Sequence, residues 1–240
     1  MTIDTKDLLN SILESLSRID YVKPEDLPNI DLYMDQVTTF MDSQLAVSKR
    51  HPEDKVLTKT MINNYAKNNL LPPPVKKKYS KEHLLALIFI YYFKNILSIG
   101  DIQEILNPIT DKYFASDLNF NLEDIYSEVF RLEKAEVLNL QKDITKKYNT
   151  SRQTFLDIPE DISEADKADL QQFAFICMLS FDVYVKKQLI EKLIDLKATD
   201  REKKEEQKKA EEQAASKSGK DKSKEKDVKK KSEKEEARDK

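Results

Sequence analysis

Amide and lysine side chains gather between Thr58 and Tyr79 at spacings that suit recognition of a polyanion. An asparagine amide can pair in two places with the edge of adenine, and lysine ammonium groups neutralise phosphates. Side chains of these two kinds and their polar neighbours form one candidate set: Thr58, Lys59, Asn63, Asn64, Lys67, Lys76, Lys77, Lys78 and Tyr79. The chemistry they offer is binding to nucleic acid through bases and phosphates.

Charge is segregated along the chain, although its net charge of −3 is small. Residues 55–94 carry eight lysines against one acid, Glu82, whereas residues 1–54 and 95–198 are acidic. A lysine cluster is more often a solvated surface than a nucleic-acid footprint. Its coincidence with the candidate set favours the footprint here.

Residues for covalent or metal chemistry are scarce. His51 and His83 are the only histidines, and neither has partners at metal-ligand spacing. Two glycines leave no phosphate-binding loop, and Cys177 is the single cysteine, which we expect to be buried and inert. We therefore expect no enzyme, no metal and no cofactor.

Local signals predict the helices that position the candidate set. Thr58 can cap a helix through about Asn68, Asn69 suits a left-handed stop, and prolines 72–74 prevent continuation. Ser80 can cap a second helix with an apolar run over residues 84–93. Ser98 and Asp101 form a capping box for a third helix, which Pro108 is predicted to end.

This pattern resembles the DNA-binding region of MerR-type regulators. More closely, it resembles a bacterial family catalogued as domain of unknown function 1836, which shares the core and the Leu-Tyr-Met-Asp-Gln segment before it. The resemblance covers roughly residues 27–110 and rests on residues 61–72, 77–80, 87–90 and 97–106. It implies a winged helix-turn-helix in which Lys76–Tyr79 form the wing and hold phosphates.

The sequence departs from the MerR pattern at four places. Asn63 stands where the recognition helix usually has arginine, Asn64 follows where tyrosine is usual, and Asn69 replaces the turn glycine. A long loop from Ser48 to Asp54 also separates the first helix from Thr58. These departures bear on base reading more than on the fold, because arginine is the commonest reader of guanine.

The rest of the chain reads as helices around this unit. Apolar spacing predicts an amphipathic arm over residues 1–19, a support helix over 31–47 and two long helices over 121–147 and 163–197. The last helix is apolar nearly all round between Phe173 and Val185, so we expect it to pack on the domain or to form a homodimer as a coiled coil. A small-molecule effector pocket among these aromatics and Tyr91-Tyr92 is a less favoured alternative to core packing.

Residues from Thr199 onward are almost entirely charged or small, which predicts disorder, with a solvent-exposed extension of the last helix to about Ala215 as an alternative for its first part. The expected domains are therefore an arm (1–28), a winged helix-turn-helix (29–110), a helical dimerisation or sensing region (111–198) and a charged tail (199–240). Without an apolar span or leader pattern, we expect a cytoplasmic location and no membrane contact.

The sequence thus predicts an all-α protein, a MerR-like winged helix-turn-helix followed by a long-helix bundle or hairpin and a disordered tail. Its predicted function is sequence-specific regulation of transcription through double-stranded DNA. The alternative is an adaptor that uses the same scaffold to bind an acidic protein, since a fold does not fix a function.

Overall fold

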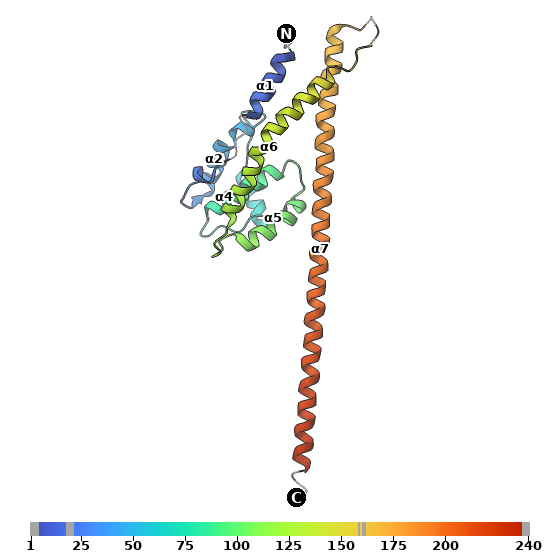
Figure 1. The fold of residues 1–240 in the computed structure, drawn as a ribbon. Coiled ribbons are helices and arrows are strands. Elements are labelled where there is room, and N and C mark those ends of the chain that lie inside the picture. Colours follow the sequence, from blue (N-terminus) through green and yellow to red (C-terminus); the bar gives the residue numbers. More distant parts are fainter. Residues whose placement is uncertain (1–4, 18–21, 158, 160–161, 237–240) are drawn as a thin grey trace. The chain divides into compact units, whose positions relative to one another are not determined.

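The computed structural model describes residues 5–17, 22–157, 159 and 162–236 (Figure 1). It contains two compact units, residues 1–191 and 192–240. Seven α-helices, two short 3-10 helices and one two-stranded sheet make up the described part, so the all-α prediction is confirmed. None of the described helices is both long and apolar enough to cross a membrane.

In chain order the elements are α1 (Thr5–Ser17), η1 (Pro24–Asp26), β1 (Leu32–Tyr33), α2 (Met34–Gln44), η2 (Ala46–Ser48), α3 (Lys59–Lys67), β2 (Lys78–Tyr79), α4 (Lys81–Phe93), α5 (Ile99–Tyr113), α6 (Leu122–Ser151) and α7 (Glu164–Glu236).

Helix α4 is the centre of the first unit. Every residue from His83 to Tyr91 is buried, as expected for a helix that is apolar on all sides. α5, α6 and β2 contact it. The Phe89 ring lies 5.4 Å from the ring centre of Tyr126 and 5.9 Å from that of Phe130, both on α6. Aromatic packing of this kind therefore fixes α6 on the core.

Three predicted caps start their helices as expected. The Ser98 hydroxyl accepts from the backbone N–H of Asp101 at 3.1 Å, and the Asn121 amide oxygen accepts from Glu123 N–H at 2.8 Å. Ser80 caps α4 together with His83, a histidine in the position where a capping box usually has Glu or Gln. Each contact satisfies backbone donors that have no partner inside the helix.

Pro108 does not end α5, contrary to the prediction. The helix continues through it to Tyr113. Leu106 and Thr110 lie on the buried face on either side of the proline, and the Thr110 hydroxyl donates to the Asn107 carbonyl at 3.1 Å. Burial of this face offsets the backbone hydrogen bond that proline removes.

The sheet joins two segments that are far apart in the sequence. Leu32 pairs with Tyr79 and Tyr33 with Lys78, antiparallel. The sequence analysis predicted neither strand, because two residues are too few for an alternating pattern. β1 therefore ties the start of α2 to the strand that precedes α4.

Within the first unit, the end of α6 contacts the start of α7, and α1 lies along α6. Tyr148 packs edge-on against Phe175 with ring centres 5.6 Å apart, and Lys147 makes an ion pair of 2.7 Å with Asp182. The Gln171 amide donates to the carbonyls of Arg152 and Thr154 at 3.1 and 3.0 Å, which closes the turn.

Cys177 is exposed, so the expectation of a buried thiol was wrong for the single chain. It lies two residues beyond Phe175, which places it on the far side of α7 from α6.

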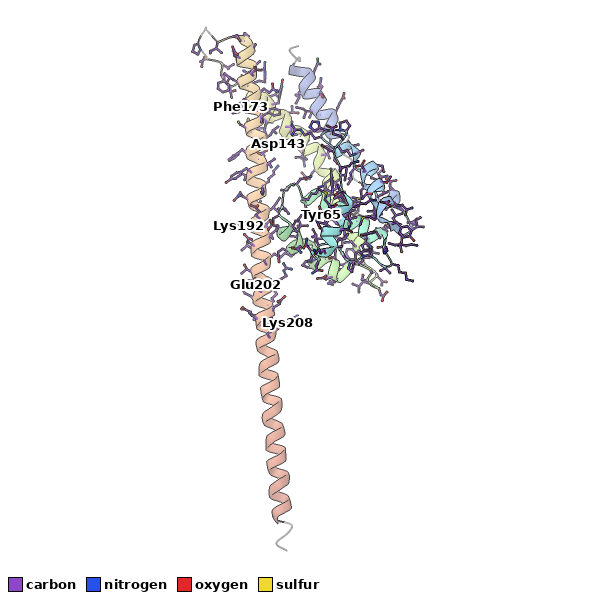
Figure 2. All side chains as sticks on the ribbon, turned by 180° about the vertical axis from the view of Figure 1, so that it is seen from behind. Tyr65, Asp143, Phe173, Lys192, Glu202 and Lys208 are labelled. Atoms are coloured by element: carbon purple, nitrogen blue, oxygen red, sulfur yellow. The ribbon has the colours of Figure 1, made fainter. Side chains whose placement is uncertain are left out.

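The second unit is the continuation of α7 from Lys192 to Glu236, along which Lys192, Glu202 and Lys208 follow one another (Figure 2). The composition predicted disorder here from Thr199, with an extension of the last helix to about Ala215 as the alternative for its first part. The helix differs from that expectation because lysine, glutamate and alanine are strong helix formers even without a buried face.

Candidate functional site

Helix α3 presents its polar side outward because its apolar side is anchored in the core. The Thr58 hydroxyl accepts from Met61 N–H at 3.2 Å and starts the helix as predicted. Ile62 and Tyr65 are buried, and Tyr65 lies inside the compact domain in Figure 2. Burial raises the pKa of the Tyr65 hydroxyl, as expected for a group removed from water.

The outward side of α3 carries the predicted residues together. Lys59, Asn63, Asn64 and Lys67 are all exposed, and no acidic residue occurs within α3. Thr60 is exposed on the same side and was missed by the sequence analysis. Helical spacing would have revealed it, since it lies one turn before Asn64. The face thus offers amides, a hydroxyl and two ammonium groups.

Lys59 has a partner that the sequence did not reveal. Its ammonium makes an ion pair with Asp35 in the first turn of α2. Both side chains are largely exposed, at 61% and 75%, so the pair contributes little to stability and can exchange for a stronger anion.

The end of α3 is held by its own backbone and by α5. Asn69 adopts a left-handed φ of 56°, as predicted, and the N–H of Leu70 donates to the Tyr65 carbonyl at 2.9 Å. The Gln103 amide donates to the Asn68 carbonyl at 2.5 Å. Asparagine therefore serves where the MerR pattern has glycine, because its short side chain tolerates this conformation.

The segment predicted as the wing begins with a two-residue hairpin turn. Val75 and Lys78 exchange two backbone hydrogen bonds of 3.1 and 2.9 Å, and Lys76 and Lys77 have φ values of 51° and 65°. Positive φ at both central positions is the geometry of a type I′ turn. Lys76 and Lys77 are exposed at its tip.

The other two residues of the predicted wing have packing roles. The Lys78 ammonium lies 5.3 Å from the centre of the Tyr33 ring. Tyr79 is only 3% exposed and packs edge-on against His83 at 5.4 Å. We therefore assign Tyr79 to the support of the turn, in place of the phosphate contact that the resemblance implied.

His83 is buried beneath β2. Its Nδ1 accepts from the backbone N–H of Ser80 at 2.9 Å. Burial lowers the pKa of its imidazole, and the carbonyls of Pro73 and Pro72 and the carboxylate of Asp31 act in the opposite direction. Nε2 has no geometrically acceptable hydrogen bond to any described residue. The imidazole is therefore held neutral as part of the core.

Helix α2 connects the two polar features. It contacts α3 on one part of its surface and β2 on another, and β1 joins it to the wing strand. The α3 face and the turn tip are thus both connected to α2.

Residues 22–129 match the family model of the domain of unknown function DUF1836. The match begins just before η1 and ends within α6, so it contains α2, α3, the wing, α4 and α5. It supports the family resemblance predicted for residues 27–110, whereas the MerR-type part of that resemblance stays a prediction. No curated protein and no solved structure matches the chain.

The DUF1836 region therefore includes every residue of the candidate set. It also includes the loop that follows α2, in which Arg50 and Lys55 are exposed. Within the part of the chain that the structure describes, no three His, Cys, Asp or Glu side chains are grouped to hold a metal ion.

Proposed function

We propose that this chain binds double-stranded DNA as a transcriptional regulator, with α3 as the groove-facing helix of a MerR-like winged helix-turn-helix. The observation that carries the proposal is the exposed face of α3, which bears Asn63, Asn64, Lys59 and Lys67 and no carboxylate. A single α-helix fits the major groove, where base edges are distinguishable. The Thr58 cap and the left-handed turn at Asn69 fix the backbone of α3, so they decide which side chains point outward.

The roles divide between the helix and the wing. Asn63 and Asn64 are suited to read base edges, because an amide can both donate to and accept from adenine. Lys76 and Lys77 at the wing tip, with Lys59 and Lys67, are suited to phosphates, which fix position but carry no sequence information. The Lys59–Asp35 pair would open when Lys59 meets a phosphate.

A second copy of the chain is the partner we propose for α7. Phe173, Phe181, Tyr184 and Leu189 are each more than half exposed in the single chain. Contiguous apolar surface of this kind on a folded protein marks an interaction site. Phe175 packs on α6 from the side of α7 opposite Phe173, Phe181 and Tyr184, so the side that carries these three rings is left for a second molecule. A symmetric dimer would present two α3 helices to two half-sites.

Recovery of genomic DNA tests the proposal directly. The purified full chain is mixed with random genomic fragments, and the bound fragments are sequenced. We expect a shared, two-fold symmetric motif among them. Recovery without a shared motif, or no recovery at low salt, would instead favour the adaptor that binds an acidic protein, because salt dependence by itself is common to both.

A further inference from the structure

The loop between α2 and α3 forms a polar pocket against the end of α4, separate from the α3 face. The pocket has a volume of about 330 Å³ and is lined by Lys49, Arg50 and Lys55 from the loop and by Tyr91, Lys94 and Asn95 from the end of α4. This volume lies at the small end of the range for ligand sites, roughly 300 to 1,000 Å³. We call it the loop pocket.

The loop that forms it is anchored at three points, so the pocket exists before any ligand arrives. Ser48 donates to the Leu45 carbonyl at 2.6 Å, and its oxygen lies 2.5 Å from the Tyr91 hydroxyl, which must therefore donate to it. Lys94 donates to the carbonyl of Val56 at 2.6 Å. Val56 is 2% exposed, which fixes the end of the loop in the core.

The charges in the loop pocket are unbalanced. Four cationic side chains line it, and its one acidic residue, Asp54, accepts from the backbone N–H of His51 at 3.0 Å. Lys49 is neutralised by Asp42 at 2.8 Å, a contact that also lowers the pKa of the Asp42 carboxyl. Arg50, Lys55 and Lys94 make no ion pair with any described side chain. The four cations of the pocket thus exceed the two carboxylates beside them, Asp42 and Asp54, and the pocket carries net positive charge.

Lys94 is the most informative of these cations. Its side chain is half-buried, and its contacts are one backbone carbonyl and the face of the Tyr91 ring, 4.8 Å from its nitrogen. Neither contact carries a full negative charge, and burial lowers the pKa of the Lys94 ammonium. Buried charges in proteins are usually paired, so an anion in the pocket would supply the missing partner.

We infer that the loop pocket binds a small phosphorylated compound. A phosphate monoester carries between one and two negative charges near pH 7, which matches the uncompensated cations. The planar guanidinium of Arg50 can hold two of its oxygens, and lysines act as point charges beside it. The occupied pocket would brace the loop that leads directly into Thr58, the cap of α3.

The test is calorimetric titration of the full chain with inorganic phosphate and with pyrophosphate, in the absence of DNA. The pocket variant Arg50→Gln/Lys55→Gln removes two exposed charges that no structural contact requires. The matched control Lys76→Gln/Lys77→Gln removes two exposed charges at the wing tip. We expect saturable binding of one ion per chain, weakened about tenfold or more by the pocket variant and about unchanged by the control.

A third variant, Lys94→Met, removes the charge of the side chain together with its hydrogen bond to the Val56 carbonyl, and should weaken phosphate binding at least as much as the pocket variant. Equal binding by all variants, or no saturable binding, would overturn the inference, because the ions would then be held only by the general surface charge. A second result would also overturn it: phosphate does not bind, and the pocket variant reduces duplex affinity as much as the control Lys76→Gln/Lys77→Gln does. Arg50 and Lys55 would then belong to a DNA-binding surface. Phosphate binding is measured without DNA. The titration therefore tests the loop pocket even if the chain does not bind DNA.

Discussion

The ammonium of Lys78 lies over the ring of Tyr33, 5.3 Å from its centre, and the two residues are paired across the sheet. This contact holds the base of the wing to the start of α2. It separates Lys78 from Lys76 and Lys77, which lie at the turn tip without such support. The three lysines of the wing are therefore not equivalent, and experiments should treat them separately.

The turn tip offers a variant whose folding and binding should change in opposite directions. Lys76→Asn/Lys77→Gly introduces the residues that type I′ turns prefer, so the free energy of unfolding should rise by about 1 kcal/mol. The same change removes two phosphate contacts, so the slope of log affinity against log salt should fall by up to about 1.8. Urea unfolding and fluorescence anisotropy with duplex DNA across a salt series measure the two effects. An unchanged slope would exclude the turn tip from the DNA contact.

Asn63 and Asn64 should behave differently from the lysines. If either reads a base edge, its replacement by alanine should weaken binding to the selected duplex by roughly 1–3 kcal/mol and leave binding to a scrambled duplex nearly unchanged. Anisotropy with both duplexes measures the difference, and Asn68→Ala is a control at the end of the same helix. Equal losses on both duplexes would show that the amides contact phosphates only.

The apolar side of α7 predicts a change in association without a change in folding. Phe181 and Leu189 are 65% and 57% exposed, so Phe181→Glu or Leu189→Glu should leave the single chain folded and weaken the dimer. Light scattering over a concentration series gives the mass. A wild-type chain that stays monomeric at high micromolar concentration would remove both the dimer and the symmetric DNA site.

Burial of His83 predicts that stability falls in mild acid. The folded-state pKa of its imidazole lies below the ordinary value of 6.5, so the unfolded chain binds the proton more readily. The contribution of neutral His83 is therefore complete above about pH 6.5 and is lost as the pH falls toward the folded-state pKa. Urea unfolding between pH 7.5 and 5 should show this slope, and His83→Gln should flatten it relative to the exposed-site control His51→Gln. An equal slope in all three proteins would point to other groups.

The second unit predicts a tolerated truncation. Removal of the residues after Lys197 takes away a highly charged segment with almost no large apolar side chains, so the melting temperature should change by no more than a few degrees. Circular dichroism should at the same time report whether helical signal is lost with the segment, which distinguishes the helix from the predicted disorder. A large drop in the melting temperature would show that the segment contributes to the fold.

Local sequence was sufficient for the starts of several helices and for the stop of α3. Thr58, Ser98 and Asn121 cap their helices through contacts within three residues, and Asn69 makes the left-handed turn that its side chain permits. These interactions are completed inside a single turn of chain, so no distant element is needed to form them. The polar face of α3 follows in the same way, because the spacing of Ile62 and Tyr65 decides which side is buried.

Tertiary structure decided what lies beneath and beside that face. The pairing of Leu32 with Tyr79, the burial of Tyr79 itself and the passage of α5 through Pro108 all depend on elements distant in the sequence. The same is true of the loop pocket, in which the Lys94 ammonium donates to the Val56 carbonyl of a loop that is distant in the sequence. Burial and charge pairing depend on which elements come into contact in the folded chain. The sequence pattern shows which residues are present but not which distant residues they contact.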